Sequence, residues 1–319
     1  MTTRQMHRRT LARLGLGGLT LIGSRAKATS AEESIQAPSL PHLGANALAR
    51  AADRSYFADG HRGAALVAAD VLITQTNLSD EGSARIRHLL EQNWAATELC
   101  KDFPVEDPVT DPCRVVGLTL AEGGSNLREV GHDVIFAMHA MHVFRTHPHL
   151  ATPQRVEGVC RLLKSIKPWR DNPADPTVQP PPFSDARLAS RFVLREALQA
   201  VPRFSGFGQG FAGHMLTFGQ ALIEMAATGG EEWAEACRTA FCKYVTVTRQ
   251  GPAKTDRKIA DHKPSVLRPN QPVYWKNRGE RTLGLGHVFK YPAAYYELLE
   301  HAQDPDLQQD FEEQAWQIF

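Results

Sequence analysis

Four histidines, each directly preceded by a glycine, are the residues of this chain best suited to chemistry. His61, His132, His214 and His287 form its only Gly-His pairs, separated by 71, 82 and 73 residues. With 24 glycines and 13 histidines among 319 residues, random placement predicts about one such pair. Neutral imidazole is the commonest protein metal ligand, and three or four suit zinc, copper or iron. The pattern therefore predicts one shared, catalytic site in which all four histidines bind a divalent transition metal.

Two other interpretations of the Gly-His pairs remain open at this point. A duplicated packing or capping device would produce the same pattern, with each imidazole bonded to a neighbouring carbonyl group. Alternatively, helix N-termini attract anions and disfavour cations, so four of them around a pocket would suit a ligand that carries a carboxylate. Metal binding, metal-free catalysis or ligand binding, and a structural role are thus all compatible with the sequence.

His139 and His142 are further candidates for ligand binding. They follow His132 by seven and ten residues, which places the three on roughly one face of a helix. On an otherwise apolar helix these imidazoles need polar partners, and bonds to the backbone are the alternative to a ligand. The HxxH spacing lacks the glutamate of HExxH, which excludes a zincin-type metalloprotease.

The segment from 249 to 281 is strongly basic and ends in an aromatic pair. It holds nine basic residues against three acidic ones. Tyr274, Trp275 and Arg278 are candidate ligand-binding residues that could hold an acidic glycan by stacking and charge. Together with a Tyr/His acid–base pair, they favour a lyase or hydrolase of acidic polysaccharides, and a solvated loop is the alternative.

The elements that must position the histidines also recur. An apolar stretch of about three helical turns follows each Gly-His pair, for example RGAALVAADVLI after His61. A polar break and a second, amphipathic stretch come next. This pattern predicts an all-α fold of four helical-hairpin repeats, either closed as an α/α toroid or open as a solenoid. A toroid is analogous to terpenoid cyclases and polysaccharide lyases, but their diagnostic motifs are not visible, and fold analogy does not carry function.

Several details of this arrangement are also expected from the sequence. An extra helix over 184–201 accounts for the longest interval between histidines. Thr152 caps the second helix of its repeat, with Pro153 at the first helical position. Pro292 delays the last apolar helix and leaves His287 in a loop. Cys100 and Cys113 flank a proline-rich loop and could pair in an oxidising compartment.

The N-terminal segment looks like an export signal. Arg8-Arg9 precedes a weakly apolar run from 14 to 23, and Ala26-Lys27-Ala28 offers a cleavage site with small residues. Residues 1–28 resemble twin-arginine signal peptides, which implies export of the folded protein to the periplasm or the extracellular space. A basic N-terminal tail is the alternative. We expect a tether over 29–45 and a single α-helical repeat domain over 46–319.

Composition excludes some classes of function. The 36 basic and 35 acidic residues balance, so no global field for nucleic acid exists. No second long apolar segment follows the leader, which argues against a permanent membrane span. The sequence favours an exported enzyme with a central histidine-lined pocket that takes a small molecule or an acidic glycan. A non-catalytic helical-repeat binding protein is the alternative.

Overall fold

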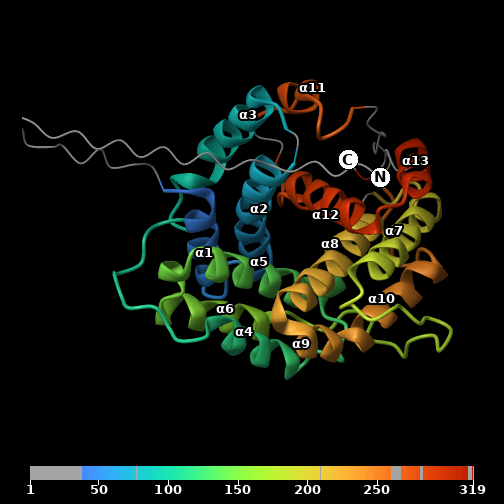
Figure 1. Ribbon diagram of the computed structural model, residues 1–319, viewed down its shortest axis with the longest axis horizontal. Coiled ribbons are helices and arrows are strands. Elements are labelled where there is room, and N and C mark those ends of the chain that lie inside the picture. Colours follow the sequence, from blue (N-terminus) through green and yellow to red (C-terminus); the bar gives the residue numbers. More distant parts are fainter. Residues whose placement is uncertain are drawn as a thin grey trace, which may run out of the picture. The chain divides into compact units, whose positions relative to one another are not determined.

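The computed structural model describes residues 38–76, 78–208, 210–259, 267–280, 283–314 and 318. Helices and loops make up these ranges, with one isolated bridge between Arg128 and Pro168 and no named strand among them (Figure 1). The predicted all-α class is therefore confirmed. The expected leader at 1–28 and residues 29–37 of the expected tether lie outside the described residues.

Four helices carry the Gly-His pairs and are called the histidine helices. They are α2 (Tyr56–Gln75), α5 (His132–Thr146), α8 (Gly210–Met225) and α12 (His287–Ala302). Helix α2 packs against α5, α5 against α8 and α8 against α12, while α12 also packs against α2 (Figure 1). Their sequences are apolar on nearly every side, as expected for helices that are enclosed by others.

A more amphipathic helix follows each histidine helix, as the repeat predicts. Ser79 caps the first of them through its side chain, which accepts a hydrogen bond from the Gly82 backbone at 3.1 Å. These second helices are α3 (Asp80–Leu90), α6 (Pro153–Ser165), α9 (Glu231–Ala236) with α10 (Arg238–Gln250), and α13 (Pro305–Gln314). Short π and 3-10 turns join some elements: η1 (Glu91–Ala95), η2 (Glu129–Gly131), η3 (Pro148–Leu150) and η4 (Ala226–Gly230).

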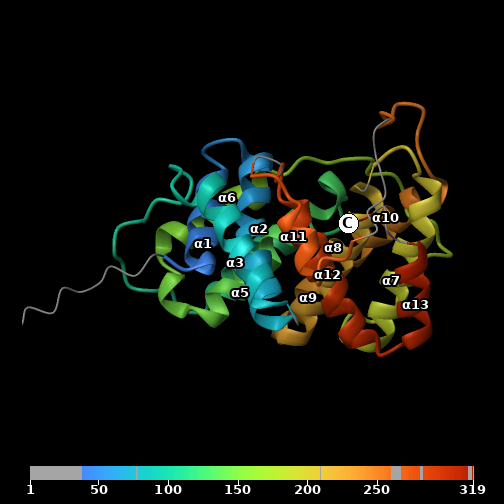
Figure 2. The same ribbon diagram turned by 90° about the horizontal axis from the view of Figure 1, so that it is seen from above.

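The remaining helices surround this framework. Helix α7 (Ala186–Arg203) confirms the extra helix expected over 184–201, and Figures 1 and 2 place it beside α13. Helices α4 (Pro112–Ala121) and α11 (Pro272–Lys276) were not expected. Helix α1 (Leu40–Ala51) begins inside the segment expected to be a tether, because Leu40, Leu43 and Leu48 bury their side chains where α1 meets α2 and α6.

Three local expectations need correction. Helix α12 begins at His287 itself and continues through Pro292, so the expected loop at His287 is wrong. Gly286 precedes the helix at φ 78°, and Pro292 removes only the hydrogen bond to the carbonyl of Val288, four residues earlier. The Thr152 side chain does not cap α6, because its hydroxyl accepts a hydrogen bond from Arg155 at 3.2 Å instead.

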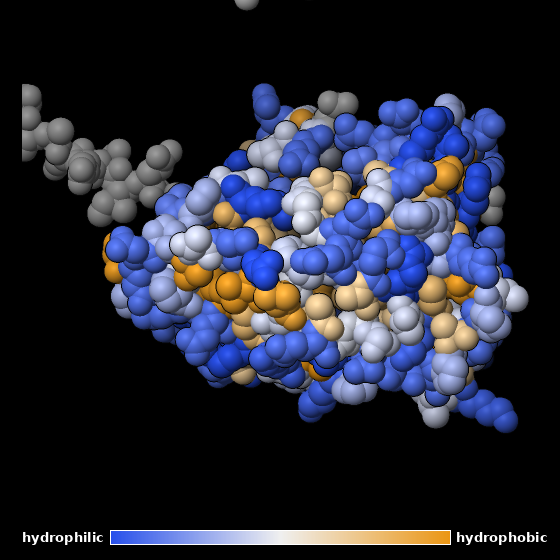
Figure 3. Space-filling view, turned by 60° about the horizontal axis from the view of Figure 1, so that its bottom comes forward, coloured by the Kyte–Doolittle hydropathy of each residue, from blue (hydrophilic) through white to orange (hydrophobic). Residues whose placement is uncertain are grey.

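Cys100 and Cys113 are free, so the suggested pairing of the two is not present. No helix in the described ranges has both the length and the apolar character needed to cross a membrane. The face in Figure 3 is mostly hydrophilic with an apolar area. The exposed large apolar residues of the described chain include Val115 and Leu118 of α4.

Candidate metal centre

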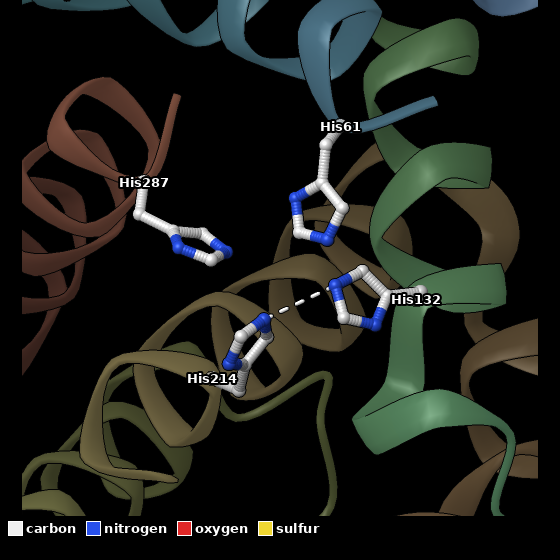
Figure 4. A group of neighbouring side chains, drawn as sticks. All are labelled: His61, His132, His214 and His287. Atoms are coloured by element: carbon white, nitrogen blue, oxygen red, sulfur yellow. Dashed lines mark hydrogen bonds between the residues drawn. The ribbon is translucent and has the colours of Figure 1, made fainter. Parts of the chain in front are cut away.

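The four Gly-His histidines meet at one point, as the sequence predicts. One ring nitrogen from each histidine lies within 4.8 Å of the corresponding nitrogen of every other. Around the cluster the ring centroids are 4.3 Å apart for His61 and His132, 4.7 Å for His132 and His214, 5.0 Å for His214 and His287, and 4.8 Å for His287 and His61. Figure 4 shows the four rings directed toward a common centre. The histidines follow one another around this centre in chain order.

The glycine before each histidine allows the next histidine helix to approach. A Cβ atom at any of the four glycines would lie 2.2 to 2.5 Å from a side chain of that neighbour. The neighbouring side chain always belongs to the residue four positions after the next histidine: Phe136 for Gly60, Phe218 for Gly131, Tyr291 for Gly213 and Ala65 for Gly286. The Gly-His pair thus joins a close-packing position to an inward imidazole, which explains why the dipeptide recurs as a unit.

Backbone carbonyl groups fix the tautomers of His132 and His214. Nδ1 of His132 contacts the carbonyl oxygen of Glu129, and Nδ1 of His214 lies 2.5 Å from the carbonyl oxygen of Gly210. Because a carbonyl oxygen can only accept, both Nδ1 atoms carry the hydrogen and both Nε2 atoms present a lone pair. These two Nε2 atoms face each other at 3.1 Å (Figure 4). A backbone carbonyl on Nδ1 is the usual way in which a metal-binding histidine is oriented.

His61 and His287 also have ring nitrogens in need of a partner. Nε2 of each is buried without a hydrogen bond to any described residue. The other nitrogen of His61, Nδ1, contacts the amine of Lys290. The ring of His287 stacks on Tyr291 at a centroid distance of 4.7 Å. Ligands of a tetrahedral ion with bonds of about 2.0–2.1 Å are about 3.3 Å apart, so small side-chain movements would close the cluster around one ion.

The environment keeps the four imidazoles in the neutral form that a metal requires. Burial lowers the pKa of His214 to about 3 and lowers the pKa values of the other three well below 6.5. After burial, the Lys290 amine and the neighbouring histidines act in the same direction. No proton therefore has to leave these rings before an ion binds at neutral pH.

Lys290 is a residue of the site that the sequence pattern did not predict. Its side chain is buried, and this burial lowers the pKa of its amine well below the usual value. The available signal was a lysine three residues after His287 in an otherwise apolar stretch. Tyr291 was missed as well, and its hydroxyl lies 3.1 Å from Nδ1 of His214. A lysine and a tyrosine of the same helix, α12, thus contact the histidine cluster.

The other predicted ligand-binding residues lie apart from the four histidines. His139 and His142 line a cavity of about 110 Å³ between the histidine helices. Trp275 is fully buried, stacks on Phe289 at 5.6 Å, and donates its indole hydrogen to the carbonyl of Pro269. Tyr274 is also buried, and the guanidinium of Arg278 lies 4.5 Å from its ring centre. Protein atoms therefore cover the two rings that were expected to stack on a glycan.

A surface cleft of about 660 Å³ adjoins the histidine cluster and is called the side cleft. Asp59 and Arg62, which flank His61 on α2, line it together with Trp94. Leu283 and Gly284, which precede His287, line it as well. His287 is the most exposed of the four histidines. The side cleft is thus lined by sequence neighbours of His61 and His287, and none of the four histidines is itself part of the lining.

The comparisons give no independent indication of what this site does. No family model, no curated protein and no solved structure matches the chain.

Proposed function

We propose that the four histidines bind one divalent transition-metal ion, and that the protein is an exported enzyme which uses this ion on a small molecule. The observation that carries the proposal is the pair of Nε2 atoms of His132 and His214, 3.1 Å apart. Their carbonyl-bonded Nδ1 atoms leave two lone pairs directed at each other, with no proton between them. A cation that both nitrogens coordinate relieves this repulsion and satisfies both rings.

An anion suits the cluster less well than a metal ion. An anion needs donors, whereas His132 and His214 present acceptors at the centre of the cluster. The N-termini of α5 and α12 lie at their histidines and disfavour a cation by about 2 kcal/mol at most. Binding of a structural zinc ion contributes about 10–16 kcal/mol, so the helix dipoles do not decide the outcome.

A purely structural role for the histidines accounts for fewer of the contacts. The backbone carbonyls satisfy one nitrogen each of His132 and His214. They leave the inward Nε2 atoms of His61 and His287 buried and unpaired among the described residues. Each unsatisfied buried group destabilises the fold by about 1–3 kcal/mol, so four inward nitrogens without partners would lower the stability of the core considerably. The alternative of a non-catalytic binding scaffold is therefore less well supported.

We also infer that the four repeats close into an α/α ring with the metal at its mouth. Two observations support this. Helix α12 packs against α2, and Gly286 lies against Ala65 just as the other three glycines lie against their neighbours. In an open solenoid the first and last histidine helices would have no such contact. Export through a twin-arginine leader belongs to the same proposal, since that route carries folded proteins and would deliver a loaded metal centre.

The four imidazole ligands limit which reactions the site can support. Four neutral imidazoles leave the positive charge of the ion uncompensated, and imidazole suits zinc, copper and iron. Such an ion can polarise a carbonyl or phosphoryl oxygen, or lower the pKa of a bound water. The side cleft would admit the substrate beside His287. Its lining holds Arg54 and Arg62 against Asp59 and Glu98, and Arg62 pairs with Asp59 at 2.7 Å, so the cleft does not select a substrate by charge.

Metal content and cobalt titration test this proposal. The protein is stripped with a chelator, dialysed and titrated with Co²⁺, whose visible spectrum reports coordination by nitrogen ligands. We expect one equivalent to bind, and we expect His132→Ala and His214→Ala to abolish the spectrum while the circular dichroism stays helical. His149→Ala, at an exposed histidine, is the matched control. Binding that persists in both cluster variants, or no binding to the folded wild type, would overturn the proposal.

A further inference from the structure

A second polar site lies among the histidine helices, separate from the four histidines. It is the cavity of about 110 Å³ noted above, here called the inner cavity. Its apolar lining includes Ala68, Met138 and Ala294. A dry cavity of about 150 Å³ accommodates benzene, so this one suits a molecule of fewer heavy atoms.

The inner cavity adjoins a surface cleft of about 520 Å³, here called the outer cleft. Four residues line both spaces and therefore mark the boundary between them: Val71, Gln75, Ala293 and Glu297. Gln75 and Glu300 in the lining of the outer cleft are exposed, so this cleft is open to solvent. The inner cavity thus borders a solvent-filled cleft along α2 and α12.

Two buried side chains of the inner cavity have hydrogen-bonding atoms without a partner. His139 is only 6% exposed, and neither of its ring nitrogens forms a hydrogen bond within the described ranges. Gln220 is 7% exposed, and its amide nitrogen donates to Glu297 at 2.9 Å, which leaves its Oε1 atom without a donor among the described residues. Protein atoms do not cover these atoms completely, as expected for atoms that border the cavity. Because buried polar atoms are nearly always satisfied, the pair calls for a molecule that both accepts and donates hydrogen bonds.

His139, Gln220 and Glu297 present uncharged groups to the inner cavity. Burial is the main cause that lowers the pKa of His139 to about 3, so its imidazole is neutral at pH 7. Burial and the neighbouring Glu224 raise the pKa of Glu297 to about 8, so its carboxyl group is mostly protonated. Glu224 itself forms an ion pair with Arg145 at 3.1 Å. An ion would therefore enter the cavity without a counter-ion, which is unfavourable, whereas a neutral molecule needs none.

We propose that the inner cavity binds one small neutral carboxamide, of the size of acetamide. Its carbonyl oxygen accepts a hydrogen bond from the imidazole of His139, its NH₂ group donates to Oε1 of Gln220, and its methyl group contacts the apolar lining. A carboxamide carries an acceptor and a donor side by side, which matches this pair, whereas a carboxylate carries acceptors only. Lys290 also lines the cavity, but its amine contacts Nδ1 of His61, and acetamide requires no charge on it. Binding requires no metal ion either.

Acetamide binding to the metal-free protein tests this proposal. ¹³C-labelled acetamide is titrated into chelator-treated protein at pH 7 and followed by NMR, with acetate as the charged molecule of the same shape. A ligand of so few heavy atoms binds weakly, so the titration extends to high millimolar concentrations. We expect saturable binding of one acetamide per chain. Acetate should bind at least about tenfold more weakly, because it enters without a counter-ion.

Two variants locate the binding site. Ala294→Met fills the inner cavity without removing a polar group, and His139→Phe keeps a ring but removes its hydrogen-bonding atoms. Each should weaken acetamide binding at least about tenfold, through loss of the space or of a buried hydrogen bond. His149→Phe, at an exposed histidine, is the matched control and should leave binding unchanged. Circular dichroism and the thermal midpoint show whether each variant is folded, and either variant provides the test if the other does not fold.

Three outcomes would overturn the proposal. Absence of saturable acetamide binding to the folded wild type would mean that the inner cavity holds water only. Acetate binding as tight as that of acetamide would contradict the neutral lining. Acetamide binding that is unchanged in the folded variants would place the ligand elsewhere on the protein.

Discussion

Nε2 of His132 and Nε2 of His214 face each other at 3.1 Å. Because backbone carbonyl oxygens contact both Nδ1 atoms and can only accept, we infer that each Nε2 carries a lone pair and no hydrogen. A backbone carbonyl oxygen accepts a hydrogen bond from Nδ1 of each ring, so a change of tautomer would break that hydrogen bond. The metal-free protein therefore keeps an unfavourable contact in its core, which an ion between the rings converts into a favourable one. Stability should depend on metal for this reason.

Metal removal should accordingly lower the thermal midpoint. An ion present at about 1,000 times its dissociation constant adds about 4 kcal/mol, which corresponds to roughly 8 °C for a domain of this size. Calorimetry of the metal-loaded and chelator-treated protein measures the difference. His132→Ala should lose the response to metal, whereas His149→Ala should keep it. Equal midpoints with and without metal in the wild type would contradict the metal centre.

The role of the glycine before each histidine can be tested with two matched glycine variants, one at a Gly-His pair and one elsewhere. Gly131 and Gly229 have nearly the same backbone conformation, with φ values of 91° and 90°. A Cβ at Gly131 would lie 2.3 Å from the ring of Phe218, whereas nothing lies within 4 Å of a Cβ at Gly229. Both alanine variants incur the backbone strain of about 1–2 kcal/mol, and only Gly131→Ala adds an overpacking cost of about 1–3 kcal/mol.

The two glycine variants should also differ at the metal site. Gly131→Ala should weaken metal binding because the added methyl group displaces His132, while Gly229→Ala should bind metal normally. Chemical denaturation and cobalt titration of both proteins provide the two measurements. If both variants lose the same stability and bind metal equally, the glycine serves only its backbone conformation and not the packing of the histidine helices.

The sequence allowed the histidine cluster to be predicted because packing and chemistry recur in the same dipeptide. Each glycine permits a close approach between helices, and the histidine after it points inward. Both properties belong to adjacent residues and recur once per histidine helix. Lys290 was not predicted, because its burial depends on α2 and α12 lying together, which no local pattern reports. In the sequence, this single lysine is surrounded by apolar residues and does not change the pattern of the stretch.

Other differences have equally physical causes. Trp275 and Tyr274 looked like surface aromatics because basic residues surround them in the sequence. In the fold, α11 turns these rings into the core, where Trp275 stacks on Phe289. Pro292 looked like a helix breaker, but a proline near the start of a helix removes only one hydrogen bond. The sequence pattern alone predicted the helices well. Whether a loop residue faces the core or the solvent depends on tertiary packing, which the pattern does not report.

Export is predicted from residues that lie outside the described part of the chain. If residues 1–28 are a twin-arginine leader, replacement of Arg8 and Arg9 by lysine should block export, because the paired arginines are the recognised feature. The mature protein should begin near Thr29. N-terminal sequencing of the exported protein and fractionation of the host expressing the variant provide the measurements. Full-length chain retained in the cytoplasm of its own host would show that the leader interpretation is wrong.

His139 should make the protein less stable in acid. Burial, followed by the charges of Lys290 and His142, lowers the pKa of His139 to about 3 from a usual value of 6.5. Between these values the unfolded chain binds a proton that the folded chain does not. Stability should therefore fall by up to about 1.4 kcal/mol for each unit that the pH drops below 6.5. His139→Phe should show a shallower dependence in metal-free protein, measured by urea unfolding between pH 4 and 7. An unchanged slope would show that His139 becomes protonated within the fold.

Glu297 should have the opposite effect, destabilising the protein as the pH rises. Burial and Glu224 raise the pKa of its carboxyl to about 8 from 4.5, and the folded chain holds a proton there that the unfolded chain releases. Each pH unit between these values should cost up to about 1.4 kcal/mol. Glu297→Gln keeps an oxygen to accept the hydrogen bond from Gln220 and has no proton to lose.

The Glu297→Gln variant should match the wild type near pH 4.5 and become progressively more stable than it toward pH 8. Urea unfolding at several pH values measures this, with Glu300→Gln at an exposed position of the same helix as the control. His301 lies 3.9 Å from Glu297, so repeating the series in His301→Gln separates its contribution. A variant less stable than wild type at pH 7.5 would mean that Glu297 is ionised in the fold and paired.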